Sequence, residues 1–280
     1  MLGAAVGFGA IPSDPVADAI FDASLFGGAA HLRANRSRAL LRVQEVGAFD
    51  IRAGAEVTVA LDSGAHPLRV LANLYGTVAA LVLGQQGRFA IHGSTLRLDG
   101  GGTTLAGAQR AGKSTTALEL VRRGHELVAD DVSPVDPAED GSGVSVEGFG
   151  RSAHFWPETV EALGVPVPPG ARPFPTTGKL VAPVVAAPGP VPLGSIVVIE
   201  TRAGIEGVRS ERVARRDAVP LLTLHSYRSN LTSRLWPDAL FRWVALVAET
   251  TDVWRVARPV EGWTAPAVAD DVERLAGPVR

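Results

Sequence analysis

The chain has 280 residues, of which 46% are hydrophobic and 20% charged, a composition typical of a soluble globular protein. Its formal net charge of -2 gives no indication of a nucleic-acid or anionic-membrane partner. The absence of cysteine excludes disulfides, thiol nucleophiles and cysteine-ligated metals, and fits a reducing cytoplasm. Because neither a basic leader nor an unbroken apolar stretch of about 20 residues is evident, we expect a cytoplasmic protein without a spanning helix.

The first part of the chain has the pattern of a β-rich lobe. Residues 1 to 65 alternate short apolar runs with glycine, aspartate and proline, which predicts short strands joined by turns. Apolar residues at close to helical spacing between 68 and 83, followed by Gly84 and Gly87, predict a buried helix. This helix opens the second predicted domain, residues 66 to 280.

The second domain alternates predicted strands and helices. Short strands are expected at 88 to 91, 94 to 98, 103 to 106, 125 to 129, 193 to 200 and 253 to 257. Helical spacing is expected at 113 to 123, 235 to 249 and 268 to 275. Residues 134 to 150 and 166 to 192 are rich in glycine or proline, which predicts surface connections with some extended pieces.

A phosphate-binding loop is the most specific motif in the chain. Residues 107 to 114, Gly-Ala-Gln-Arg-Ala-Gly-Lys-Ser, match G-x-x-x-x-G-K-[ST] between a predicted strand and a predicted helix. Its backbone N–H groups and the helix N-terminus attract phosphate, Lys113 reaches the outer phosphates, and the Ser114 hydroxyl can bind Mg²⁺. We therefore expect ATP and Mg²⁺, with phosphate contacts from Gly107, Ala108, Gln109, Arg110, Ala111, Gly112, Lys113, Ser114 and Thr115.

Two adjacent carboxylates, Asp130 and Asp131, follow the strand that comes next after the loop helix. The carboxyl ends of strands in an α/β sheet collect ligands, so this pair should lie beside the loop. One carboxylate could accept a proton from an attacking hydroxyl while the other binds the metal. The alternative is that the pair is a solvated turn, which the neighbouring phosphate loop makes less favourable.

Histidine and lysine residues supply weaker signals. His92 precedes the loop between apolar neighbours, where it is as readily a core residue as a ligand near triphosphate. Only two of the 27 basic residues are lysines, Lys113 and Lys179, which makes both candidates for phosphate contacts. A polar and aromatic cluster lies between residues 224 and 236. It consists of His225, Tyr227, Arg228, Arg234 and Trp236. A packing role at the start of the C-terminal helices is favoured over a peptide-binding groove.

Residues 88 to 135 resemble the catalytic core of the HPr kinase family, which has a branch that phosphorylates lasso-peptide precursors. The shared features are the His-Gly strand, the phosphate loop, the helix that closes in Arg-Arg-Gly and the strand that runs into Ala-Asp-Asp. The resemblance implies an α/β fold, with a mixed-sheet P-loop kinase core like that of phosphoenolpyruvate carboxykinase beside the N-terminal lobe. It also implies transfer of the γ-phosphate of ATP to a serine hydroxyl.

Residue roles follow from the same resemblance. It implies that Lys113 and Ser114 contact phosphate and Mg²⁺ and that Asp130 is the base for the acceptor hydroxyl. It places Asp131 on the metal side, with His92 nearby as a third catalytic residue.

Two later positions match the family more weakly. Glu147 falls where the family has a metal-side glutamate, and Lys179 is similar to a basic position after the substrate-facing loop. The loop departs from the family at Gln109 and Arg110, where small residues are usual. A side chain at Arg110 restricts left-handed backbone angles, so the loop takes a different shape there or the guanidinium itself meets phosphate.

The expected function is an ATP-dependent kinase for a serine or threonine hydroxyl of a peptide or protein, including a lasso-type precursor. HPr itself is not expected as the substrate, since the segment by which HPr kinase grips it is not found. The alternatives are a small-molecule kinase of the shikimate-kinase kind and a nucleotide-binding ATPase or regulatory protein. More than 100 residues precede the loop here, whereas shikimate kinases open with it. Homo-oligomer formation is left open.

Overall fold

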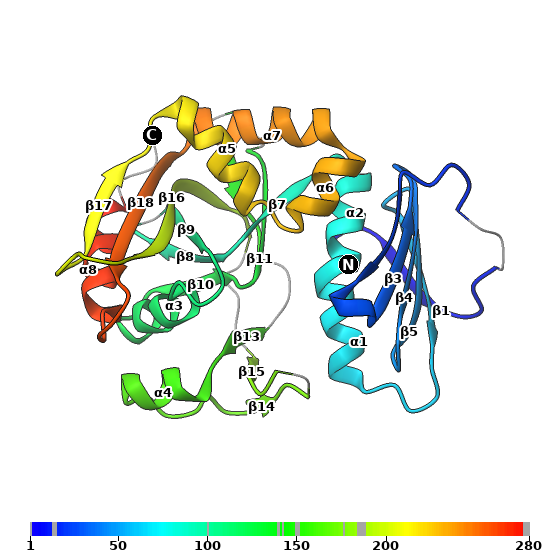
Figure 1. Cartoon of the computed structure of the whole chain (residues 1–280), viewed down its shortest axis with the longest axis horizontal. Helices are drawn as coiled ribbons and strands as arrows, with labels where there is room; N and C mark the ends of the chain where they lie inside the picture. The colour runs from blue at the N-terminus through cyan, green and yellow to red at the C-terminus, as the bar shows by residue number, and fades with distance from the viewer. Residues whose placement is uncertain are drawn as a thin grey trace. The chain divides into compact units, whose positions relative to one another are not determined.

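The computed structural model describes residues 2–12, 16–99, 101–138, 141, 143–148, 152–175, 177–183 and 189–276. The chain divides into two compact units, Met1–Ala90 with Tyr227–Trp243, and Ile91–Ser226 with Val244–Arg280. Each unit combines a β-sheet with helices, which confirms the predicted mixed α/β class (Figure 1).

A six-stranded sheet forms the first unit, in the order β1-β6-β5-β4-β3-β2. β1 pairs in parallel with β6 and the other neighbours are antiparallel. Alternating residues such as Ala30, Leu32 and Ala34 are buried, because successive side chains of a strand point to opposite faces. The strands are β1 (Ala5–Phe8), β2 (Phe21–Leu25), β3 (Ala30–Ala34), β4 (Arg38–Val43), β5 (Gly47–Arg52) and β6 (Glu56–Leu61).

A helical segment lies along one face of this sheet (Figure 1). It runs as α1 (Pro67–Asn73), the π-helical turn η2 (Leu74–Val78) and α2 (Ala79–Gln85), with non-helical angles at Gly76. Contrary to the sequence expectation, this segment is long and apolar enough to cross a membrane, with a mean hydropathy of 1.4. In the structure 61% of its apolar window is buried, and the Gln85 side chain accepts a hydrogen bond from Gly54 N at 2.7 Å. This burial is typical of a core helix.

The same unit also includes a later segment of the chain, Tyr227–Trp243. Helix α6 (Ser229–Leu235) is followed by Trp236, whose Nε1 donates to the Arg36 carbonyl at 3.2 Å. A Cβ at Gly84 would lie 2.2 Å from the Trp236 ring, so only glycine fits beneath this indole. The predicted boundary at residue 65 stays a prediction, and the helix at 67–85 belongs to the compact unit of the N-terminal sheet.

The second unit is built on a nine-stranded mixed sheet. Its order is β10-β8-β9-β16-β12-β11-β7, and β18 joins β16 and carries β17 at its outer edge. The 12-residue β16 runs parallel to both β9 and β18, so the carboxyl ends of these three strands meet at one edge. The strands are β7 (Phe89–His92), β8 (Ser94–Leu98), β9 (Gly101–Gly107), β10 (Glu126–Ala129), β11 (Val132–Pro137), β12 (Val144–Val146), β16 (Val191–Arg202), β17 (Arg209–Arg212) and β18 (Asp252–Pro259).

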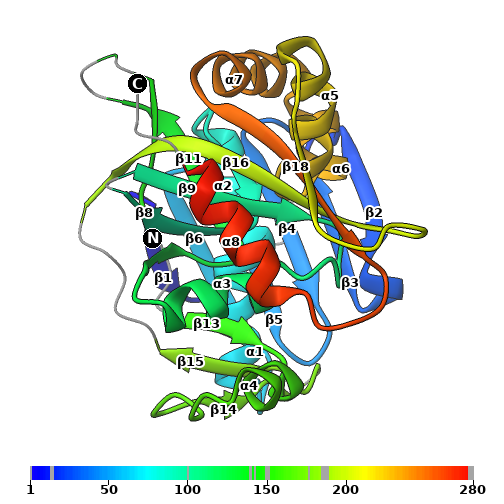
Figure 2. The same ribbon diagram turned by 90° about the vertical axis from the view of Figure 1, so that its left-hand side faces the viewer.

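Two helices, α3 (Lys113–Arg122) and α8 (Ala265–Leu275), cover one face of this sheet (Figure 2). The apolar core between helices and sheet includes Leu105 of β9, Leu120 of α3 and Val268 of α8. All three of these side chains are fully buried. This packing fixes the orientation of α3, whose first residues form the end of the phosphate-binding motif.

A smaller three-stranded sheet completes the second unit, together with helices α4 and α5. Its order is β13 (Ser152–Phe155), β15 (Leu180–Pro183) and β14 (Arg172–Pro173), and α4 (Pro157–Leu163) packs against it through Phe155 and Val160. Helix α5 (Arg215–His225) and helix α7 (Pro237–Thr250) precede β18.

Most predicted elements are present, and several elements were missed, among them β13, α4 and α6. The sequence pattern gave no expectation for β17 or for α5, which contains Pro220 in its interior. The prediction of surface connections was wrong in part, because Pro134, Val135, Val144 and Val146 are buried strand residues. Those strands lie inside the mixed sheet, where the neighbours rather than the local composition decide burial.

A buried carboxylate anchors α3 to its surroundings. Glu119 has a side chain that is 1% exposed and accepts two hydrogen bonds from Arg122 and one from Arg123. Arg123 also donates to Asp270 and Glu273 of α8, at 2.7 Å each. The network therefore links the two helices that cover the loop side of the sheet.

We expect Glu119→Ala to lower the free energy of unfolding by roughly 2 kcal/mol in urea denaturation. The expected loss is smaller than the cost of about 3–5 kcal/mol when a fully buried ion pair loses one partner, because the Arg122 side chain is 47% exposed. The control is Glu126→Ala, which breaks a surface pair with Arg97 and should cost about 0–1 kcal/mol; the Glu126 side chain is 60% exposed. Equal losses in the two variants would contradict the anchoring role.

Glu119 should also contribute to the pH dependence of stability. The hydrogen bond from Arg122 holds the pKa of the Glu119 carboxyl below its ordinary value, burial opposes this shift, and Arg123 reinforces it. Since the folded-state pKa is lowered, the stabilisation is fully present above the unfolded-state pKa of about 4.3 and is lost as the pH falls through the folded value. Acid titration of unfolding should show this loss in the wild type and a flatter curve in Glu119→Ala.

Candidate nucleotide-binding site

The phosphate loop connects the end of β9 to the start of α3. Gly107 has a φ of +140°, and a Cβ there would lie 2.3 Å from the Ile199 carbonyl oxygen of β16. Gly112 has a φ of +113° at the N-cap of α3. Both positions require glycine, because L side chains rarely adopt these angles.

The N-terminus of α3 is open to an anion. The first N–H groups of a helix have no intrahelical acceptor, and no described side chain caps this end. Ala108, Gln109 and Arg110 are exposed, while Lys113 and Ser114 are half-buried. Free backbone donors at a helix N-terminus that follows a glycine turn fit a phosphate group.

Lys113 lies against the loop that it belongs to. Its Nζ donates to the carbonyl oxygens of Gly107 at 2.8 Å and Ala108 at 3.1 Å. Burial lowers the pKa of the Lys113 ammonium, Asp131 opposes this shift, Lys179 adds to it, and Asp130 opposes it again. These effects bring both aspartates and the second lysine into the electrostatic surroundings of Lys113, as a phosphotransfer site requires.

Arg258, at the end of β18, supports the loop through hydrogen bonds to its carbonyl groups. The sequence analysis did not identify this residue. Its Nε donates to the Ala111 carbonyl at 2.8 Å and its Nη2 to the Arg110 carbonyl at 3.4 Å. These bonds hold the Arg110 and Ala111 carbonyl groups on the side of β18. Arg110 itself has a φ of +67°, so the loop accepts a non-glycine residue in the left-handed region. The only sequence signal for Arg258 was its place at the end of a strand.

Asp130 is held tightly at the end of β10. Ser94 Oγ donates to its Oδ1 at 2.6 Å and His154 N to its Oδ2 at 2.8 Å. Burial raises the pKa of the Asp130 carboxyl, but the hydrogen bonds from His154 and Ser94 outweigh burial and hold the pKa below its ordinary value. Asp130 is therefore ionised at neutral pH and has a fixed orientation.

Asp131 differs from its neighbour in exposure and in backbone conformation. Its side chain is 50% exposed, and its φ is +65°. The Asp131 carbonyl oxygen lies 3.1 Å from His92 Nδ1, and its Oδ1 lies 3.6 Å from the same atom. The left-handed turn thus directs the two adjacent carboxylates to different surroundings, one buried and one accessible.

The remaining predicted residues differ in how they are placed. Thr115 Oγ1 lies 3.3 Å from Thr159 Oγ1 of α4, so this hydroxyl has a partner in the protein. Lys179 Nζ lies 5.4 Å from the centre of the Trp156 ring. Glu147 is exposed after β12 and has no hydrogen bond or ion pair with a described loop residue.

Metal binding by protein side chains alone is not indicated in the described part of the chain. No group of three or more His, Asp or Glu residues that could hold a metal ion occurs among the described residues. Mg²⁺ at kinase sites is usually held by one or two protein ligands plus phosphates and water, so it needs no such cluster. The roles of Ser114, Asp131 and Glu147 as metal ligands stay predictions.

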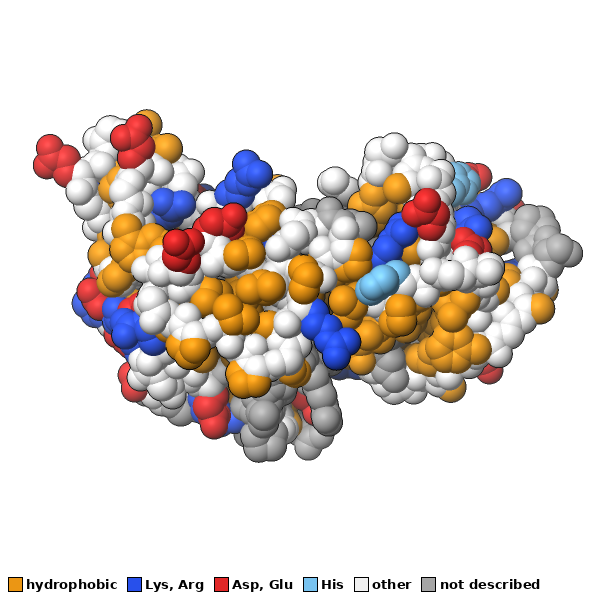
Figure 3. All heavy atoms as spheres, turned by 90° about the horizontal axis from the view of Figure 1, so that it is seen from below, with side chains coloured by type: hydrophobic (Ala, Val, Ile, Leu, Met, Phe, Trp, Pro, Cys, Tyr) orange, Lys and Arg blue, Asp and Glu red, His pale blue; other side chains and the backbone are white. Residues whose placement is uncertain are grey.

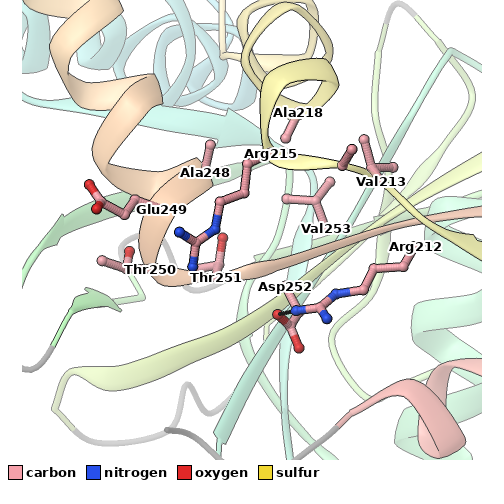
Figure 4. A pocket seen from close by; sticks show the side chains of 11 residues that line it. Arg212, Val213, Arg215, Ala218, Ala248, Glu249, Thr250, Thr251, Asp252 and Val253 are labelled. Carbon is pink, nitrogen blue, oxygen red and sulfur yellow. Dashed lines mark hydrogen bonds and ion pairs between the residues drawn. The ribbon is translucent and has the colours of Figure 1, made fainter.

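A separate cavity of about 590 Å³ lies in the second unit, away from these residues (Figure 4). It is bordered by the start of α5, the end of α7 and the start of β18. Arg212 pairs with Asp252 at its edge, and Arg215 and Glu249 come from the two helices. None of the predicted site residues lines it.

Surface charge on the face shown in Figure 3 gives no second indication of a binding site. On the face shown in Figure 3, basic and acidic side chains of the described residues are interspersed with apolar ones. This agrees with 27 basic and 29 acidic residues in the chain. The phosphate loop therefore remains the strongest indication of a ligand.

The loop, the helix N-terminus and the aspartate pair form a candidate nucleotide site at the carboxyl edge of an α/β sheet. Residues 86–148 match the family model for the HPr Serine kinase C-terminal domain. The predicted resemblance to the HPr kinase family is therefore confirmed for the segment that carries the site.

Individual relatives agree over the same short length. The HPr kinase/phosphorylase of Exiguobacterium sibiricum is 50% identical over 52 residues, 19% of this chain and 17% of that protein. The protein of the same name from Treponema pallidum is 42% identical over 65 residues, 23% of this chain and 17% of the relative. The matches thus span less than a fifth of the length of these relatives. The Hpr(Ser) kinase/phosphatase structure from Coxiella burnetii has a TM-score of 0.32 and 15% identity, over 66% of this chain and 88% of that one.

Arg258→Met should weaken the binding of Mg·ATP about tenfold or more. Loss of hydrogen bonds from a charged group costs about 1.5–3 kcal/mol, and here the loss would release the loop carbonyls. Isothermal titration calorimetry measures the change in Kd. The matched control is Arg202→Met on the neighbouring strand β16, where the arginine side chain is 52% exposed. An unchanged Kd for Arg258→Met would show that the loop keeps its shape without this support.

Proposed function

We propose that this protein is an ATP-dependent kinase that phosphorylates a serine or threonine hydroxyl of a peptide or protein. The observation that carries the proposal is the open phosphate loop at the N-terminus of α3, with Lys113 folded over it and Asp130 and Asp131 at the end of the next strand. The family model for the HPr Serine kinase C-terminal domain covers residues 86–148, which include the loop and both aspartates. The whole activity is a proposal because the matched segment is short.

Each loop residue would have a defined task toward bound nucleotide. The residues of the phosphate loop, 107 to 115, would surround the phosphates with N–H donors, and Lys113 would exchange its two carbonyl partners for phosphate oxygens. Lys179, near Lys113, would add positive charge. Mg²⁺, held by Ser114 and Asp131 with support from Glu147, would offset the charge of the phosphates.

Transfer then needs a proton acceptor at the substrate hydroxyl. The hydroxyl oxygen would form its bond to the γ-phosphorus as the bond to the β-phosphate oxygen breaks, and the proton would pass to Asp130. A carboxylate with a lowered pKa is a weak base, which suits a loose transition state where the proton leaves late. His92 would hold the Asp131 carboxylate in place through its contact with that residue.

The nature of the acceptor rests on the resemblance alone. The relatives are named as kinases of HPr, and a lasso-type precursor peptide is the finer proposal for this chain. The absence of cysteine and the near-neutral charge support a cytoplasmic setting without a nucleic-acid or membrane partner. Homo-oligomer formation remains part of the proposal.

Two variants test this assignment. Lys113→Ala should abolish phosphate transfer, because the developing charge on the phosphates would lose its ammonium partner. Asp130→Asn should leave the Kd for Mg·ATP within about threefold while transfer falls by about 10²-fold or more, the usual contribution of a general base. Mass spectrometry of a serine-containing peptide incubated with protein, ATP and Mg²⁺ detects the added phosphate.

Asp217→Asn serves as the matched control, since this aspartate is 56% exposed at the start of α5. Transfer retained in Asp130→Asn would overturn its role as the base. ATP turnover without a modified peptide in the wild type would favour the alternatives, a small-molecule kinase or an ATPase.

A further inference from the structure

A histidine that packing explained at the level of sequence lies opposite His92, and the charge of Lys113 acts on its ring. His225 is the last residue of α5, and the next residue, Ser226, forms an antiparallel bridge with Ile91. In an antiparallel pair the residue after one partner faces the residue before the other. The bridge therefore sets His225 opposite His92, the histidine that contacts Asp131.

The His225 imidazole has no hydrogen bond or ion pair with another described residue. Each of the five other histidines has a side-chain hydrogen bond or ion pair. The residue is half-buried. A partly buried polar group without a partner costs free energy unless a ligand or water completes it.

The electrostatic surroundings of this imidazole indicate what the ligand would be. Burial, together with the positive charges of Lys113, His92 and Arg255, lowers the pKa of His225 to about 4. All three of these neighbours are basic, and no carboxylate is among the causes of the shift. The ring is therefore neutral at pH 7, and the positive neighbours favour an anion beside it.

We propose that the His225 imidazole N–H donates a hydrogen bond to a phosphate oxygen of the nucleotide bound at the loop. The inference rests on the proposed function, because it requires a nucleoside triphosphate at residues 107 to 114. The phosphate oxygens would supply the acceptor that the described protein lacks, between Lys113 on one side and His92 on the other. A neutral imidazole suits this position because it donates without competing with Mg²⁺ for the phosphate charge.

The first experiment observes the ring directly. Long-range ¹H–¹⁵N NMR spectra of the imidazoles, assigned with single histidine variants, are recorded while a non-hydrolysable ATP analogue with Mg²⁺ is added. The His225 ring signals should shift with the same apparent Kd as calorimetry gives. Signals of His31, on β3 of the other unit, should stay unchanged. Nucleotide binding that leaves the His225 signals in place would overturn the inference.

Variants provide the second readout. His225→Ala should raise the Kd for the ATP analogue about tenfold, as expected when a hydrogen bond to a charged group is lost. His225→Gln, which keeps an N–H donor, should recover part of this loss. Leu224→Ala is the matched control, because this neighbour on the same helix is 68% exposed. A Kd within twofold of the wild type for His225→Ala would also overturn the inference.

Failure of the two proposals can be told apart. Wild-type protein that binds the analogue and shifts the His225 signals, but phosphorylates no peptide, would contradict the peptide-kinase proposal and support the phosphate contact. Wild-type protein that binds no nucleotide would overturn both. Should His225→Ala fail to fold, the NMR titration of the wild type and the His225→Gln variant still decide the question.

Discussion

The site depends on one junction, where β9 ends and α3 begins. Gly107 passes within van der Waals distance of the β16 backbone, and Gly112 turns the chain into the helix with a left-handed angle. This leaves the first N–H groups of α3 unpaired and pointing outward. Their positive field attracts phosphate, and the same geometry lets Lys113 reach back over the loop. A side chain at Gly107 would collide with a backbone carbonyl.

The rest of the second unit holds this junction in place. Apolar contacts among β9, α3 and α8 fix the helix axis, and the buried Glu119 network ties α3 to α8. Arg258 reaches the loop carbonyls from β18, two strands away across β16. The loop is therefore supported by packing on its helix side and by hydrogen bonds on its sheet side. Such preorganisation lowers the cost of binding phosphate.

The two aspartates show how one turn separates two chemical roles. The positive φ at Asp131 sends its side chain toward solvent and His92, while Asp130 remains buried between Ser94 and His154 N. The Asp130 carboxylate is ionised because its hydrogen bonds outweigh the cost of burial. An accessible carboxylate suits a metal bound to phosphate, and an ordered one suits a single proton acceptor.

The sequence by itself determined the mixed α/β class, the strand–loop–helix motif and the position of the aspartate pair, because glycine angles, helix spacing and motif order are local properties. It also located the strands and helices on both sides of the loop. It did not determine α5, β17 or the burial of β11 and β12, whose local patterns are weak. Only the tertiary structure showed that Arg258 supports the loop and that His225 lies opposite His92. Arg258 is about 150 positions from the loop along the chain, and His225 is about 130 positions from His92. The pairing of distant strands brings these residues to the site.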